Sequence, residues 1–248
     1  MVSGGPVEMQ HQSASLDIGS PSKETMGHSS SGVGAPPAYT DTAIIFDWDD
    51  TLLSSSWLAS EGLRLDSPVE VPEEARAQLD VLESYVIKIL SRALELGEVH
   101  LVTNAENGWI ELSARRFIPG VVPYLSCVKI ISARSTYERM FPDQPHMWKV
   151  EAFRKQIGEA MTANGRRSST DGYWNILSFG DSVHEREALY TVTENVHNVQ
   201  TKSVKFVERP TIEQLQRQLQ VVLSCFDYIC GYTGNLDLML TVQLLYGK

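Results

Sequence analysis

The stretch AIIFDWDDTLLSSS, Ala43 to Ser56, decides the fold of this chain. Its first four residues, Ala43 to Phe46, are apolar and have the length and composition of a buried strand. Three aspartates, Asp47, Asp49 and Asp50, follow at once. Carboxylates this close together repel one another and lose hydration when they are buried. We therefore expect a metal cation to relieve the repulsion and the carboxylates to take part in chemistry.

Short apolar runs alternate with amphipathic stretches beyond this first strand, which is typical of strand–helix–strand units around a parallel sheet. Strands are predicted over residues 43–46, 99–103, 128–132, 174–180 and 195–200. Helices are predicted over residues 72–97, 109–118, 148–161 and 211–229, with an exit loop over 164–172. The expected fold class is α/β: a three-layer, Rossmann-like, mostly parallel sheet with helices on both faces.

The composition divides the chain into a tail and one domain. Residues 1–40 hold eight Ser, six Gly and four Pro but one aromatic residue, so they are expected to be a disordered tail. Residues 41–248 are expected to form the folded domain, with a C-terminal helical extension from about residue 208. No internal repeat is visible.

Net charge and cysteine content exclude several classes of protein. The formal net charge of −10 disfavours nucleic acid as a partner. The three cysteines, Cys127, Cys225 and Cys230, are too few and too irregularly spaced for a disulfide framework or a zinc knuckle. No apolar signal core or membrane-length apolar run is visible. We expect an intracellular, cytoplasmic protein that does not bind a membrane.

Polar side chains follow several of the predicted strands at the point where each strand ends. Asp47 and Asp49 follow the first strand, Thr103 ends the second, and Asp181 follows the fourth. Lys149 lies at the start of the helix before that fourth strand. In open α/β sheets, ligands bind beyond the carboxyl ends of the strands. These residues are therefore candidates for one shared site.

In this order, the residues resemble the four motifs of the haloacid dehalogenase superfamily, and in particular its phosphatase branch. Asp47 to Thr51 matches the D-x-D-x-T motif after a strand, Thr103 the second motif and Lys149 the third. The fourth motif, an acidic pair such as GDxxxD, is matched by Asp181 and by Glu185, which stands where the family more often has Asp. The resemblance covers about residues 42–200 and implies a catalytic domain without a large cap.

The resemblance implies a hydrolase with a catalytic role for each motif residue. Asp47 would attack phosphorus and form an aspartyl-phosphate, and Asp49 would act as general acid and then base. Thr103 would donate a hydroxyl hydrogen to the phosphate. Lys149 would keep Asp47 ionised and screen the transferring group. The presence of Asp49 favours phosphate esters over carbon–halogen bonds.

Magnesium is the cofactor that the resemblance implies. Its ligands would be the Asp47 carboxylate, the backbone carbonyl of Asp49 and the Asp181 carboxylate, because Mg²⁺ prefers oxygen ligands and would reduce the repulsion between carboxylate and phosphate. Asp50, although also acidic, is expected to cap the turn that follows it.

Other residues are expected to support the site. Ser182 and Glu185 would support the metal ligands from behind. Asn104, just past a strand end, would either contact substrate or only cap a helix or end a turn. Lys155 follows Lys149 in the same predicted helix, so the sequence leaves open which of the two is the motif lysine.

The segments that carry caps in this family are short here, which bears on the substrate. Residues 52–71 suit a flap hairpin or a loop but are too few for an independent core. A capless member is expected to act on a substrate large enough to close the site itself, such as a phosphoprotein. A small phosphometabolite stays open as an alternative.

Two other functions are compatible with the sequence. One is transfer of the phosphoryl group to an alcohol acceptor, as in phosphotransferases and phosphomutases. The other is a catalytically weak interaction protein that keeps the fold, with the predicted helix over 211–229 facing a partner. Intact Asp47, Asp49 and Asp181 favour the phosphatase over this last reading.

Overall fold

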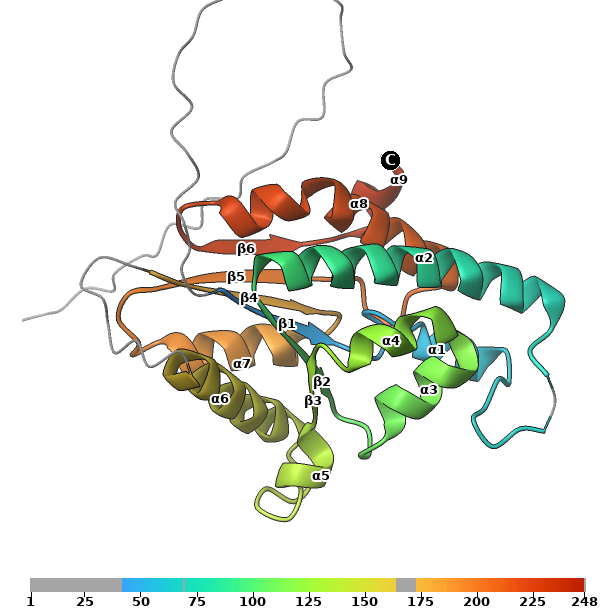
Figure 1. Cartoon of the computed structure of the whole chain (residues 1–248), viewed down its shortest axis with the longest axis horizontal. Helices are drawn as coiled ribbons and strands as arrows, with labels where there is room; N and C mark the ends of the chain where they lie inside the picture. The colour runs from blue at the N-terminus through green and yellow to red at the C-terminus, as the bar shows by residue number, and fades with distance from the viewer. Residues whose placement is uncertain (1–41, 69, 164–172, 248) are drawn as a thin grey trace, which may run out of the picture. The chain divides into compact units, whose positions relative to one another are not determined.

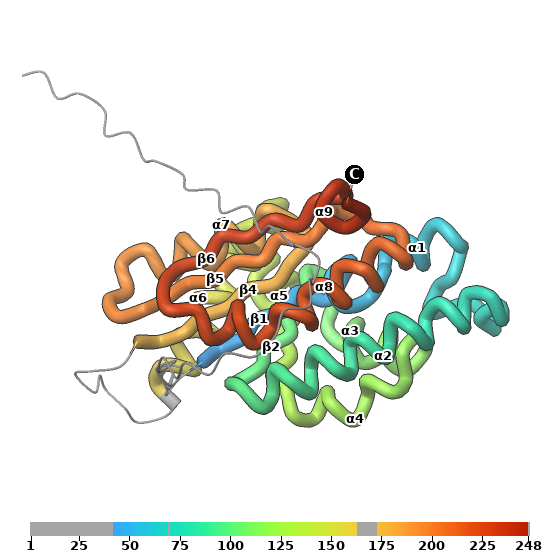
Figure 2. The backbone as a smooth tube through the Cα atoms, turned by 90° about the horizontal axis from the view of Figure 1, so that it is seen from above, coloured from blue at the N-terminus to red at the C-terminus, as the bar shows by residue number. Residues whose placement is uncertain are grey.

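The protein is built on a six-stranded sheet in which every neighbouring pair of strands is parallel (Figure 1). The structure, a computed structural model, describes residues 42–68, 70–163 and 173–247. The strand order is β3-β2-β1-β4-β5-β6, and most of it can be followed from above in Figure 2. The strands are β1 (Thr42–Asp47), β2 (Glu98–Thr103), β3 (Lys129–Ser132), β4 (Trp174–Gly180), β5 (Val199–Lys205) and β6 (Leu236–Met239).

Helices cover both faces of the sheet, so the predicted three-layer α/β class is confirmed. One face carries α2 (Glu73–Leu96) and α8 (Ile212–Gly231), and the other carries α6 (Pro145–Ala163) and α7 (Val183–Thr193). The shorter helices are α1 (Ser55–Ser60), α3 (Trp109–Phe117), the 3-10 helix η1 (Pro119–Val121), α4 (Val122–Leu125), α5 (Ala133–Tyr137) and α9 (Val242–Tyr246).

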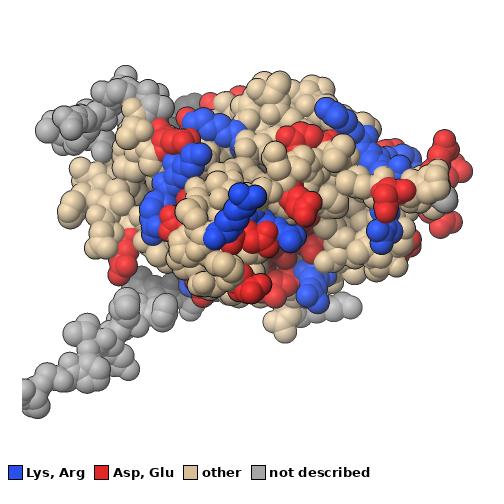
Figure 3. All heavy atoms as spheres, turned by 90° about the horizontal axis from the view of Figure 1, so that it is seen from below, with Lys and Arg blue, Asp and Glu red and all other residues tan. Residues whose placement is uncertain are grey.

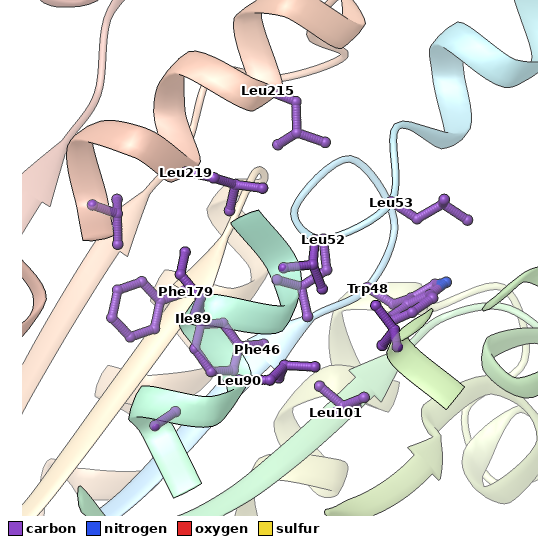
Figure 4. Packing of buried hydrophobic residues seen from close by; sticks show 14 of the residues in the cluster. Phe46, Trp48, Leu52, Leu53, Ile89, Leu90, Leu101, Phe179, Leu215 and Leu219 are labelled. Atoms are coloured by element: carbon purple, nitrogen blue, oxygen red, sulfur yellow. The ribbon is translucent and has the colours of Figure 1, made fainter. Parts of the chain in front are cut away.

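The alternation of side chains along β1 connects the core to the site. Ile44 and Phe46 belong to the larger apolar cluster, under α2 and α8, where the Phe46 ring stacks on Phe179 with centroids 4.8 Å apart (Figure 4). Ile45 belongs to the second cluster, under α6 and α7. Because strand side chains alternate between faces, Asp47 follows Ile45 toward α6 and α7.

Helix α2 begins and ends at the predicted proline and glycine. Pro72 is its N-cap, Glu73 and Glu74 lie in its first turn, and Gly97 is its C-cap. A Cβ atom on Gly97 would lie 2.4 Å from the carbonyl oxygen of Thr42, so glycine is required where the helix turns back into the sheet. The helix buries six side chains in the core: Leu79, Leu82, Val86, Ile89, Leu90 and Ala93.

The predicted fifth strand was misplaced. It was expected over residues 195–200, whereas β5 spans Val199–Lys205. Lys202 and Lys205 interrupt the hydrophobic pattern by which a buried strand is predicted, although both side chains are buried. Their ammonium groups donate to backbone carbonyls, Lys202 to Cys230 at 2.7 Å and Lys205 to Asp181 at 3.0 Å.

The C-terminal part of the chain is more than the predicted helical extension. After α8 the chain forms β6, which pairs with β5 and adds a sixth strand to the sheet. The helix predicted from Thr211 is observed as α8, with Thr211 as its N-cap; the Thr211 side chain accepts from Gln214 N–H. Its residues Leu215, Leu219 and Val222 are buried in the core and Cys225 is half-buried, so this face, which could have met either a partner or the core, packs on the core.

The segment between β1 and α2 contains a short helix where we expected a flap hairpin or a loop. Leu52, Leu53 and Leu58 of this segment are buried in the main core. Within the part of the chain that the structure describes, no large cap is present, as predicted. The predicted disordered tail and the predicted exit loop over 164–172 lie outside the described residues.

Charges are mixed on the surface. On the face seen from below, Lys and Arg lie among Asp and Glu (Figure 3). Of the helices in the described ranges, none has the length and apolarity that crossing a membrane requires.

Candidate active site

The parallel register brings the predicted residues to one edge of the sheet. Asp47 is level with Val102, one residue before Thr103, and Phe46 is level with Phe179, two residues before Asp181. The strand order reverses between β1 and β4, which is the crevice where open α/β sheets bind ligands. One cavity of about 480 Å³ at this edge is lined by seven of the predicted residues: Asp47, Asp49, Asn104, Lys149, Asp181, Ser182 and Glu185.

A buried lysine between two carboxylates forms the floor of the site. Lys149, on α6, is 2% exposed and pairs with Asp47 and with Glu185, whose Oε1 lies 2.9 Å from the ammonium nitrogen. Lys155, the alternative motif lysine, is exposed and lies near Glu159 instead. Burial therefore assigns Lys149 and excludes Lys155 from the site.

Charge and burial act against each other in this triad. Burial raises the pKa of Asp47 well above its ordinary value, although attraction to Lys149 opposes the rise. Burial by itself would lower the pKa of Lys149, but attraction to Asp47 and Glu185 outweighs it and raises that pKa. Burial would raise the pKa of Glu185, yet Lys149 and a hydrogen bond from Ser182 lower it. The ammonium group thus stays charged and links both carboxylates.

Glu185 is held by the turn that carries the fourth motif. Its Oε2 accepts from the Ser182 hydroxyl at 2.6 Å and from the Ser182 backbone N–H at 3.1 Å, which closes a capping box at the start of α7. Gly180 leaves the room for it, because a Cβ atom there would lie 2.5 Å from Glu185 Cγ. Glu185 is therefore held in place where it orients Lys149.

Asp181 faces the same cavity from the end of β4. Burial, with repulsion from Glu185 and Asp50, raises its pKa to about 7, although a hydrogen bond from the Arg209 backbone N–H opposes the rise. Its own backbone carbonyl accepts from Lys205. The pKa values of Asp47 and Asp181 are both raised, and a divalent cation bound beside the two carboxyl groups would stabilise their ionised forms.

The residues in the cavity can supply the predicted magnesium ligands only if a backbone carbonyl oxygen is counted with the side chains. Among the described residues, no group of three or more His, Cys, Asp or Glu side chains is arranged to hold a metal ion. The predicted set needs two carboxylates, Asp47 and Asp181, together with the backbone carbonyl of Asp49. The two carboxylates share the cavity, as that prediction requires.

Asp49 and Asp50 have different surroundings. The Asp49 carboxylate accepts from Thr103, whose hydroxyl we expected to donate to the phosphate; the Oγ1–Oδ2 distance is 2.8 Å. Asp50, with φ 55°, also lines the cavity, and its carboxylate caps the start of α1 by accepting from the Ser56 backbone N–H at 2.8 Å. The prediction that Asp50 is a capping residue is confirmed.

Besides Asp50, four residues that line the cavity were not assigned to it from the sequence: Ala105, Trp109, His184 and Arg209. His184 is three residues after Asp181, in the first turn of α7, so its closeness to Asp181 in the sequence was a usable signal. Arg209 has φ 46° and lies in the turn after β5, where no motif marks it. Trp109 comes six residues after Thr103, at the start of α3, and only the packing of that helix turns it toward the site.

Comparison with protein-family models, with curated proteins and with solved structures found no match.

Proposed function

We propose that the protein is a Mg²⁺-dependent phosphatase that hydrolyses phosphate monoesters through an aspartyl-phosphate. One observation carries the proposal: Asp47, Lys149 and Asp181, from β1, α6 and the end of β4, meet in one cavity at the point where the strand order reverses. A buried lysine beside a strand-end aspartate has no packing role that an apolar residue would not fill more favourably. The arrangement is explained by the anionic group that it would receive.

Each residue would have a defined step in the reaction. An Asp47 oxygen attacks phosphorus and forms the acyl-phosphate bond as the bond to the leaving oxygen breaks, and Asp49 gives that oxygen its proton, so the product leaves as an alcohol. Asp49 then takes a proton from the water that attacks phosphorus and releases inorganic phosphate from Asp47. Lys149 keeps positive charge beside the attacking carboxylate throughout.

Magnesium would be held by Asp47, Asp181 and the Asp49 carbonyl, and it would supply positive charge to the phosphate oxygens. Neighbouring residues would keep the Asp181 ligand in place. The Lys205 ammonium group donates to the Asp181 backbone carbonyl, and the Arg209 backbone N–H donates to the Asp181 carboxylate.

The open cavity supports a substrate that covers the site itself. In the described residues no cap lies over it, and exclusion of water from the intermediate would then depend on the substrate. A phosphoprotein meets this requirement, and a small phosphometabolite meets it less well.

The test is hydrolysis of p-nitrophenyl phosphate by the full chain, with magnesium and with EDTA. We expect turnover that needs Mg²⁺ and falls at least about 10³-fold in Asp47→Asn, because the mutant has no nucleophile. Equal turnover in the mutant would refute the assignment. Beryllofluoride with Mg²⁺, which imitates the phospho-aspartate, should raise the melting temperature of the wild type but not that of the mutant. Phosphate found on an added alcohol instead of water would indicate a phosphotransferase.

A further inference from the structure

The Asp49 carboxylate is held by three neutral donors from three different elements. Its Oδ1 accepts from the Ser55 hydroxyl at 2.5 Å and from the Trp109 indole N–H at 2.8 Å. Its Oδ2 accepts from the Thr103 hydroxyl at 2.8 Å. The donors belong to α1, α3 and the end of β2, so the orientation of Asp49 depends on the relative positions of these elements.

Trp109 is itself anchored to the first motif through a chain of hydrogen bonds. The indole N–H of Trp48, which lies between the two catalytic aspartates and is fully buried, donates to the Ser113 hydroxyl at 3.0 Å. That hydroxyl donates to the backbone carbonyl of Trp109 at 2.6 Å. The Trp109 indole then returns to Asp49. This circuit begins and ends in the D-x-D motif and fixes the first turn of α3 against it.

A bound substrate would change the hydrogen bonds to one oxygen of the Asp49 carboxylate but not those to the other. A hydroxyl has one hydrogen, so Thr103 cannot donate to Asp49 and to a bound phosphate at the same time. If the phosphate takes the Thr103 hydroxyl, Oδ2 becomes free while Oδ1 keeps its two donors. The indole N–H is a donor only and cannot exchange a proton with substrate, so Trp109 can orient Asp49 but cannot replace it.

We propose that Trp109 is the positioning residue for the acid–base carboxylate, holding Asp49 by Oδ1 so that Oδ2 faces the leaving oxygen. This inference rests on the proposed phosphatase function. In the reaction, the Oδ2 proton passes to the leaving oxygen as its bond to phosphorus breaks, and Oδ2 recovers a proton from the attacking water. Ser55 is the second anchor on the same oxygen, and Trp109 needs no further contact with the phosphate.

The test compares two substrates that depend differently on proton donation. An alkyl phosphate needs a proton on its leaving oxygen, whereas p-nitrophenolate leaves readily without one. We expect Trp109→Phe to lower kcat for an alkyl phosphate about 10- to 100-fold, and kcat for p-nitrophenyl phosphate less than about threefold, with KM unchanged for both. The matched control is Trp174→Phe, at the opposite end of β4, which should leave both rates unchanged.

Ser55 keeps the inference testable if Trp109→Phe does not fold. Ser55→Ala should show the same selective loss with the alkyl phosphate, and Ser55→Thr, which restores a hydroxyl, should recover most of it. Equal losses with both substrates, or no difference from Trp174→Phe, would overturn the positioning role while the wild type stays an active phosphatase. A wild type that hydrolyses neither ester would refute the proposed function, and this inference with it.

Discussion

Asp47 and Asp49 stand two residues apart in one motif, yet the protein holds them by opposite means. Asp47 is buried on the α6–α7 side and is held by charge, through Lys149 and its link to Glu185. Asp49 is less buried and is held by neutral donors, two hydroxyls and an indole, from α1, α3 and β2. The charge of Lys149 opposes the rise in the pKa of Asp47 that burial causes, whereas neutral donors orient the Asp49 carboxylate without a fixed cation beside it. Under the proposed function, the same residue type would take two roles in two environments.

The largest effect should come from removing the charge that holds Asp47. Lys149→Met leaves two carboxylates buried without a partner, so we expect activity to fall about 10²- to 10³-fold and the free energy of unfolding to drop by about 3–5 kcal/mol. The control is Lys155→Met on the exposed side of α6, which should change stability by less than about 0.5 kcal/mol. Urea unfolding and turnover of p-nitrophenyl phosphate measure both. Similar results for the two variants would show that the lysine is not part of the site.

The second largest effect should come from disturbing the packing of Glu185 against Gly180. Gly180→Ala would place a Cβ atom 2.5 Å from Glu185 Cγ and should push the glutamate away from Lys149. We expect a loss of about 1–3 kcal/mol in stability and a clear loss of activity. Gly158→Ala, on α6 with nothing within 4 Å of the added atom, should instead stabilise the protein by about 0.5–1 kcal/mol. Thermal unfolding of both variants is the measurement, and a stabilised Gly180→Ala would contradict the packing.

The pH dependence of magnesium binding tests Asp181, whose carboxyl group shares the cavity with Asp47. The pKa of Asp181 is raised from 3.8 to about 7, so in the metal-free native state this carboxyl keeps a proton that the unfolded chain releases near pH 4. Its contribution to stability therefore falls as the pH rises from about 4 to 7. Protons compete with Mg²⁺ for the ionised group, so magnesium should bind more tightly at pH 8 than at pH 6.

Melting temperatures with EDTA and with MgCl₂ at these two pH values are the measurement. Asp181→Asn is the control, because it has no proton to release: it should be more stable than the wild type at pH 8 in EDTA and should gain little from magnesium. Magnesium stabilisation of the wild type that does not change with pH would exclude this carboxyl as a ligand.

The smallest effect extends the comparison to a third carboxylate with a structural role. Asp50 accepts from the backbone N–H and from the hydroxyl of Ser56, at the start of α1. Ser56→Ala removes one of these two hydrogen bonds, so we expect a loss of about 1 kcal/mol in stability and unchanged turnover. A strong loss of turnover would mean that the orientation of α1 reaches the chemistry.

The elements with strong local signals were predicted well. The apolar run before Asp47, and the proline and glycine that bracket α2, gave strand and helix with bounds close to those observed. The last two strands of the sheet, β5 and β6, were not predicted well. Lysines that point their ammonium groups to carbonyls interrupt the hydrophobic pattern of β5, and β6 has only four residues with alternating exposure. Both strands depend on pairing with a neighbour that local sequence does not reveal.

The residues of the site also fall into those that local sequence predicts and those that it does not. The order of Asp47, Thr103, Lys149 and Asp181 could be read from the chain, because strand ends and helix starts are local features. Arg209 and Trp109 could not, since each reaches the cavity through the packing of a separate segment.

By itself, the sequence determined which residue types stand at the ends of the strands, and hence the α/β class and the candidate chemistry, because hydrophobic period and turn residues act over a few positions. The tertiary structure decided between Lys149 and Lys155, made Glu185 the partner of that lysine, and gave Asp49 its three donors. These outcomes depend on which distant segments share a cavity, and burial and distance across the fold exist only after the sheet has assembled.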